Sequence, residues 1–204
     1  MAGHCMGLIK SNTYKSGPLE WPQDVALYSR EGKASWMQVR RILYQSMTGA
    51  DIALLELNAT YRKLTRLGID SYEISSEPGK PGDLIFMRKV SSPQIQSCAI
   101  EKVIPRLKAR QWEWLRTYRY TACETHDGDS GAPLISAATG KVIGVHDIQS
   151  VDENLKRTIF EFDELGRAAG PIDARYGQSA DKILTCVTPE GIFDLNAPSC
   201  KLFK

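Results

Sequence analysis

The hexapeptide Gly128-Asp129-Ser130-Gly131-Ala132-Pro133 has the clearest chemical potential in this sequence. A nucleophilic serine needs an exposed hydroxyl on a tight turn, with backbone N–H groups converging where an oxyanion forms. The glycines on both sides of Ser130 allow such a turn and the close approach of a substrate carbonyl. The same residue types are common in ordinary solvent turns. A catalytic role for Ser130 therefore depends on finding a base and an acid elsewhere in the chain.

The candidates for that base are few, because the chain contains only three histidines: His4, His126 and His146. A base that serves Ser130 needs a buried acid on its other ring nitrogen. Asp51 stands at the mouth of an apolar run, where a carboxylate is costly unless it has a hydrogen-bonding partner. His4, Asp51 and Ser130 then follow one another in the chain order of the chymotrypsin arrangement.

Three fragments carry a family resemblance: Ala2-Gly3-His4-Cys5, Asp51-Ile52-Ala53-Leu54-Leu55 and the hexapeptide around Ser130. They resemble the signature segments of the chymotrypsin/trypsin-like serine peptidases, in the family's order and with similar separations. The resemblance covers residues 1 to about 150. It implies a serine endopeptidase that acts on polypeptides through an acyl-enzyme, without a cofactor or metal. It also implies a secreted or periplasmic protein, and we expect a monomer.

The resemblance assigns roles by position. His4 would take the proton from Ser130 and pass it to the leaving amine, while Asp51 would hold the tautomer of His4. The backbone N–H groups of Gly128 and Ser130 would form the oxyanion hole. Asp129 would brace the loop that carries the serine, in this family often through a new N-terminus made on activation.

The substrate preference has three interpretations. Glu124 lies six residues before Ser130, near the place of the acid at the floor of the trypsin pocket, which would favour Arg or Lys in the substrate. His146 belongs to a segment similar to one in staphylococcal-type glutamyl endopeptidases, in which a histidine binds the substrate's Glu side chain and Thr125 could help. Alternatively, His146 lines a generic pocket.

The surrounding pattern predicts an all-β fold of two packed antiparallel β-barrels. Short apolar runs separated by turn residues are typical of strands, and two such runs flanking a small turn indicate a hairpin. We expect strands at residues 51–57, 84–87 and 98–104, a hairpin from residues 132–135 and 142–145, and a short helix within residues 106–119. A linker at residues 75–82 divides a partial N-terminal barrel, residues 1–75, from a C-terminal barrel, residues 76–204, whose tail after residue 153 is unassigned.

The chain has five cysteines, so one of them has no intramolecular partner. In the resembled family the cysteine after the histidine pairs with one further upstream, so we expect Cys5 to be unpaired. No signal peptide and no first strands precede His4, and we expect an N-terminally truncated chain whose first barrel lacks its initial strands. We predict a Cys186–Cys200 bridge and, less directly, Cys98–Cys123, although four cysteines permit three pairings.

Composition, residue spacing and motifs exclude several other classes of protein. The net charge of +2 gives no general field for nucleic acid or an acidic membrane, and no apolar run approaches the ~20 residues of a membrane helix. The cysteines and histidines lack zinc-type spacing. An α/β-hydrolase would need a glycine where Ala132 stands, as well as a βα pattern. The remaining alternative is an inactive peptidase homologue that acts as a binding protein.

Overall fold

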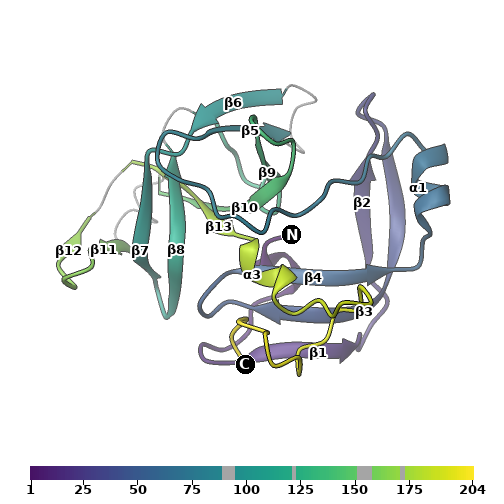
Figure 1. The fold of residues 1–204 in the computed structure, drawn as a ribbon, viewed down its shortest axis with the longest axis horizontal. Helices are drawn as coiled ribbons and strands as arrows, with labels where there is room; N and C mark the ends of the chain where they lie inside the picture. Colours follow the sequence, from purple (N-terminus) through teal and green to yellow (C-terminus); the bar gives the residue numbers. More distant parts are fainter. Residues whose placement is uncertain (89–94, 121–122, 151–157, 171–172) are drawn as a thin grey trace.

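The computed structural model describes residues 1–88, 95–120, 123–150, 158–170 and 173–204. Within these residues the chain is nearly all-β and forms two antiparallel sheets, in agreement with the predicted fold class (Figure 1). The strands of the first sheet are β1 (Tyr14–Pro18), β2 (Asp24–Tyr28), β3 (Ala34–Ser46) and β4 (Ile52–Leu57). Those of the second are β5 (Leu84–Arg88), β6 (Ile95–Ala99), β7 (Lys102–Ala109), β8 (Trp112–Tyr120), β9 (Pro133–Ser136), β10 (Val142–Gln149), β11 (Ile159–Phe162), β12 (Ala168–Ala169) and β13 (Arg175–Ser179). The short helices are η1 (Gly3–Met6), α1 (Tyr61–Arg66) and α3 (Asp181–Leu184).

The long strand β3 organises the first sheet. It pairs with β1, β2 and β4, and all three pairings are antiparallel. The register places Ser46 opposite Ile52, so that Asp51 immediately precedes β4. The predicted strand at residues 51–57 is therefore confirmed, with Asp51 just outside it.

The second sheet has the strand order β12-β11-β7-β8-β13-β10-β9-β5-β6. The predicted strand at residues 84–87 corresponds to β5, and the predicted hairpin corresponds to β9 and β10, which are antiparallel neighbours. The predicted strand at residues 98–104 is divided between β6 and β7, because the chain leaves the ladder at residues 100 and 101. The core behind β10 includes Tyr118, Leu134 and Ile143, all buried.

The helix expected within residues 106–119 is wrong: this segment forms the β7–β8 hairpin. Arginine, lysine and leucine favour helices in isolation, but the buried residues Leu107, Ala109, Trp112 and Trp114 follow the alternation of a strand. Arg110 closes the hairpin at a φ of 55°. The tertiary burial of this face outweighs the local helix propensity.

Two disulfides join Cys98 to Cys123 and Cys186 to Cys200, and Cys5 is free and exposed. The Cα atoms of the two pairs are 5.6 and 4.1 Å apart. Both predicted pairings and the unpaired Cys5 are therefore confirmed.

The C-terminal segment returns to the first sheet, where it lies beside β1 and β3 in Figure 1. Cys186 and Leu202 form a buried cluster with Tyr44 of β3, and the Tyr44 hydroxyl donates to the carbonyl oxygen of Phe203 at 3.1 Å. The division at residue 75 stays a prediction, and residue 153, where the unassigned tail was expected to begin, lies outside the described residues.

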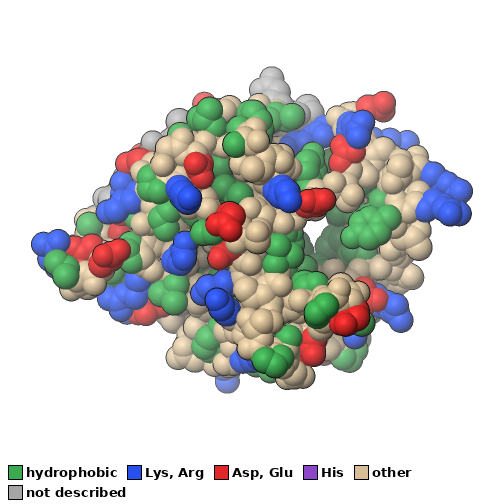
Figure 2. Space-filling view, viewed as in Figure 1, with side chains coloured by type: hydrophobic (Ala, Val, Ile, Leu, Met, Phe, Trp, Pro, Cys, Tyr) green, Lys and Arg blue, Asp and Glu red, His purple; other side chains and the backbone are tan. Residues whose placement is uncertain are grey.

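Acidic and basic side chains are interspersed on the face seen in Figure 2, and neither sign gathers into a continuous patch there. No helix within the described ranges is long and apolar enough to cross a membrane.

Candidate active site

Close packing around the short helix η1 positions His4. The side-chain amide of Gln45 donates to the carbonyl oxygens of Gly3 and Gly7, at 2.9 and 2.8 Å, and so fixes both ends of the helix on β3. A side chain at position 3 would collide with the carbonyl oxygen of Ser46 and with the carboxylate of Asp51. Glycine at position 3 therefore lets the histidine segment lie directly against β3 and the start of β4.

Asp51 holds His4 through two hydrogen bonds. The backbone N–H of His4 donates to Oδ1 of Asp51, and Nδ1 of the imidazole contacts Oδ2, both at 2.8 Å. The Asp51 side chain is 1% exposed, whereas the His4 side chain is 29% exposed. With its proton on Nδ1, the ring keeps Nε2 available to accept a second proton.

Ser130 lies on the turn that leads into β9. Gly128 and Gly131 adopt positive φ values of 95° and 89°, a conformation that favours glycine. The backbone N–H of Gly131 donates to the carbonyl oxygen of His146 at 2.7 Å, which ties the turn to β10. The Asp129 side chain is fully buried beneath the turn and accepts from the backbone N–H of His126 at 2.9 Å. The turn is thus held from below by a buried acid.

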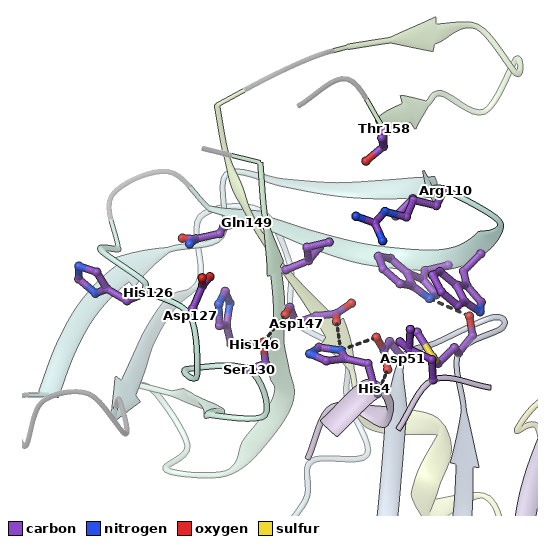
Figure 3. A pocket seen from close by; sticks show the side chains of 16 residues that line it. His4, Asp51, Arg110, His126, Asp127, Ser130, His146, Asp147, Gln149 and Thr158 are labelled. Carbon is purple, nitrogen blue, oxygen red and sulfur yellow. Dashed lines mark hydrogen bonds and ion pairs between the residues drawn. The ribbon is translucent and has the colours of Figure 1, made fainter. Parts of the chain in front are cut away.

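The fold brings His4, Asp51 and Ser130 to one cavity, which is lined by residues next to the first sheet and by residues of the second sheet (Figure 3). The Ser130 hydroxyl donates to the backbone carbonyl oxygen of Asp147 at 2.8 Å. Among the described residues no hydrogen bond joins Ser130 to His4. The serine and the histidine therefore share a site without being paired in this conformation.

The two backbone N–H groups assigned to the oxyanion hole belong to Gly128 and Ser130. Neither donates a hydrogen bond to an acceptor in the described part of the chain, whereas the flanking N–H groups of Asp129 and Gly131 do. The two N–H groups assigned from sequence thus have no internal acceptor among the described residues.

Asp147 is a site residue that the sequence reasoning missed. It follows His146 on β10, is 0% exposed, and places Oδ1 3.4 Å from Nδ1 of His4. Oδ2 accepts from the side-chain amide of Gln178 at 2.8 Å. The signal was present in the sequence, because an aspartate inside the apolar run of residues 142–148 needs a partner as much as Asp51 does.

Burial and the two carboxyl groups control the electrostatics of the site. Burial lowers the pKa of His4, but the neighbouring carboxyl groups of Asp147 and Asp51 outweigh that effect and raise it above its ordinary value. Burial, together with the negative charge of Asp51, raises the pKa of Asp147 well above its usual range. His4 and Asp147 therefore compete for one proton, which can lie on the imidazole or on the carboxyl group.

Of the residues predicted to contact the substrate side chain, one lines the cavity and two do not. His146 lines the cavity, is 2% exposed, and its Nδ1 lies 2.6 Å from the hydroxyl of Tyr120. Burial lowers the pKa of His146 to about 4, so the ring is neutral at pH 7. Glu124 is exposed and Thr125 is buried, with its hydroxyl donating to Gln149 at 2.7 Å. Neither Glu124 nor Thr125 is among the residues lining this cavity.

The nitrogen and oxygen atoms of His4, Asp51 and Asp147 lie within 4.8 Å of one another. Such a group could also surround a cation, but Nδ1 of His4 is already engaged by Asp51 at hydrogen-bond distance. The geometry is that of a hydrogen-bonded histidine and acid pair, and we assign no metal to it.

Similarity to solved structures concerns the fold alone. The protease domain of MamO from Magnetospirillum magneticum, in its apo form, superimposes with a TM-score of 0.54 at 14% identity, covering 88% of this chain and 85% of that one. An inactive serine-to-alanine mutant of Rv3671c from M. tuberculosis H37Rv gives a TM-score of 0.41 at 17% identity, covering 72% of this chain and 60% of that one. No curated protein matches the sequence.

The sequence itself matches a family model over residues 6–145, a range that begins just after His4 and contains Asp51 and Ser130. The matched family is described as the trypsin-like peptidase domain. Because the match extends over more than half of the 204 residues, this chain belongs to the trypsin-like peptidase domain family.

Proposed function

We propose that this protein is a serine endopeptidase with Ser130 as nucleophile, His4 as general base and Asp51 as the acid that orients the base. The observation that carries the proposal is the double hydrogen bond from His4 to the buried Asp51, in the cavity that Ser130 also lines. The substrate class of the family is the peptide. Two disulfides favour a secreted or periplasmic location, where such bonds persist.

In the proposed mechanism the Ser130 hydroxyl leaves the carbonyl oxygen of Asp147 by a side-chain rotation and donates to Nε2 of His4. The imidazole accepts the proton as Ser130 attacks the substrate carbonyl, and Asp51 stabilises the imidazolium that forms. The N–H groups of Gly128 and Ser130 would hold the oxyanion. Catalytic hydrogen bonds are often absent or long without substrate, so the resting position of Ser130 is compatible with this role.

For the substrate side chain, the cavity favours His146 over Glu124. His146 lines the same cavity as Ser130, and its Nδ1 is engaged by Tyr120. Glu124 is exposed and away from the cavity lining, which weakens a preference for Arg or Lys. Recognition of an acidic side chain by His146 and a generic pocket lined by it both remain compatible with this placement. Thr125 would have to leave Gln149 before it could help.

One observation favours the alternative of an inactive, peptide-binding homologue. The Ser130 hydroxyl is engaged by the Asp147 carbonyl, and within the described residues no hydrogen bond links it to the base. If this position persisted with substrate, the chain would bind peptides without cleaving them.

A fluorophosphonate probe followed by peptide mapping separates the two functions. The endopeptidase proposal expects an adduct on Ser130 that Ser130→Ala abolishes and that His4→Ala slows strongly. Ser130→Ala should also lower kcat on a peptide substrate by about 10⁶-fold, because the triad residues act as a unit. The exposed Ser76 provides a matched control, since Ser76→Ala should leave labelling unchanged. Binding of peptides with no adduct on Ser130 would favour the inactive homologue.

A further inference from the structure

Asp147 touches both halves of the proposed catalytic machinery. Its backbone carbonyl accepts the Ser130 hydroxyl at 2.8 Å, and its side chain reaches to 3.4 Å from Nδ1 of His4 (Figure 3). The side chain is completely buried. A carboxylate in such a place needs donors on both oxygens, since an ionised group without partners is strongly disfavoured in the interior.

Among the described residues, only one of the two carboxyl oxygens of Asp147 accepts a hydrogen bond. Oδ2 accepts from Nε2 of Gln178 at 2.8 Å. Oδ1 is buried, and no described group forms a hydrogen bond with it. The nearest candidate is the Nδ1–H of His4, but that hydrogen is directed to Asp51 at the shorter distance of 2.8 Å. Oδ2 therefore has the surroundings of a carbonyl oxygen, whereas Oδ1 has no donor of its own to stabilise a negative charge.

An acceptor for a hydroxyl at Oδ1 lies beside it. An oxygen of Asp51 lies within 4.8 Å of one of Asp147, and after burial the negative charge of Asp51 is the main cause of the raised pKa of Asp147. Two ionised carboxylates this close repel each other strongly in a buried site, which favours retention of one proton between them.

The charged and titratable groups that face this cluster include Tyr120 of β8, whose pKa burial and the charge of Asp147 raise, and Arg175 of β13, whose positive charge acts on Tyr120 and His146. From η1 come His4 itself and the exposed Cys5, and from the segment before it comes the buried terminal amine of Met1, whose pKa burial lowers. From β10 comes His146, whose pKa burial lowers to about 4. Asp127, His126 and Arg110 line the wider cavity, and only Arg110 among them carries a permanent positive charge.

We propose that Asp147 is a positioning residue that works as a neutral carboxylic acid: its Oδ1 hydroxyl donates to the Asp51 carboxylate, while its Oδ2 carbonyl accepts from Gln178. Asp51 remains the ionised partner of His4, and the imidazole stays neutral and able to accept the proton of Ser130. If Asp147 were ionised instead, the same proton would lie on His4 and block the base. The inference rests on the proposed function, because it explains how two buried acids leave His4 competent.

Three substitutions at Asp147 test the hydrogen bond. Asp147→Asn offers the same pattern, with an amide N–H toward Asp51 and a carbonyl toward Gln178, and should keep kcat/KM within about 3-fold. Asp147→Ser should keep part of the activity through its hydroxyl. Asp147→Leu removes the donor and should lower kcat/KM by about 10- to 100-fold, the range for a hydrogen bond to a charged group. Asp24→Asn, on the exposed side of β2, controls for the loss of a carboxylate elsewhere.

The pH dependence of kcat/KM and NMR titration of His4 test whether the Asp147 side chain is neutral or ionised. The His4 signal is identified by its absence in His4→Gln, and neither the titration nor its comparison between variants needs activity. We expect the acidic limb of the profile and the His4 midpoint to move by less than about 0.3 pH units in Asp147→Asn, since a neutral amide replaces a neutral acid. A fall of more than about one unit in the His4 midpoint would mean that Asp147 is ionised and would overturn the proposal.

The two proposals fail in different ways. If Ser130 takes no fluorophosphonate adduct in the wild type, the proposed function fails, whereas an unchanged His4 midpoint in Asp147→Asn still supports the neutral acid. If Ser130 is labelled but Asp147→Leu matches the wild type in rate and pH profile, the role of Asp147 is refuted and the endopeptidase stands. Thermal unfolding of each variant identifies losses of activity that come from misfolding.

Discussion

Replacing Asp51 by asparagine is the most direct perturbation of the proposed base. Asp51 accepts from both the backbone N–H and the Nδ1–H of His4 at 2.8 Å, and the amide of asparagine cannot accept both of these hydrogen bonds. One hydrogen bond to a charged acceptor is worth about 1.5–3 kcal/mol, or about 10- to 150-fold in rate. The amide N–H also favours the His4 tautomer with its proton on Nε2, which cannot accept from Ser130. Together these effects should lower kcat by about 10⁴-fold.

The KM should change by less than about 3-fold in Asp51→Asn, because the Asp51 side chain is 1% exposed and does not reach a substrate. Steady-state hydrolysis of a peptide measures both kcat and KM, and the rate of fluorophosphonate labelling reports the reactivity of Ser130, with Asp24→Asn as the control. A fall in kcat of less than about 10-fold would refute the reasoning. It would mean that another group, with Asp147 the nearest at 3.4 Å, orients His4 instead.

Further predictions concern stability, packing and specificity. Converting Cys186 and Cys200 to serine should lower the free energy of unfolding by about 3 kcal/mol, measured by urea titration, because the bridge closes a loop across 14 positions. His146, with its folded pKa of about 4 against 6.5 unfolded, binds protons mainly when unfolded, so stability should fall as pH drops from about 6.5 toward 4. His146→Gln should remove about 2–3 kcal/mol of that loss between pH 7 and 4.5, and an unchanged slope would contradict it. Gly3→Ala should reduce both stability, by roughly 1–3 kcal/mol, and kcat, since the added methyl collides with the Ser46 carbonyl and the Asp51 carboxylate. A peptide library varied before the cleaved bond should show a preference that depends on His146 rather than on Glu124, and a preference for Arg or Lys lost in Glu124→Ala would exclude this.

The three proposed triad positions could be selected from the sequence because each lies in a short motif whose residue types are dictated locally, and their catalytic roles stay predictions. Gly128 and Gly131 mark a turn that needs positive φ, and Asp51 marks the start of an apolar strand. The structure contains both disulfides that were predicted, although the sequence could not choose between the possible pairings. Their spacing alone left three pairings open, and the fold selects one by bringing Cys98 and Cys123 from separate segments together.

The hairpin of β7 and β8 could not be predicted from propensity alone. Its strand β8 contains Arg116 at a φ of 56°, and around it Leu115 and Arg116 are both exposed while Thr117 and Tyr118 are both buried, without a change of register against β7. This irregularity interrupts the simple alternation by which strands are recognised. Asp147 was missed for a related reason: its partners Gln178 and His4 come from distant strands and segments, and only the assembled fold places them against it.

The return of the C-terminal segment to the first sheet has a consequence for synthesis. Strands β1 to β4 are complete by Leu57, yet Tyr44 and Leu54 pack against Cys186, Cys200 and Leu202. A chain that grows from its N-terminus will leave this apolar patch uncovered until residues 186–204 have been made. The first sheet therefore exposes this patch to aggregation during translation. Because Cys186 and Cys200 belong to the segment that covers it, we expect the disulfide between them to help keep the patch covered.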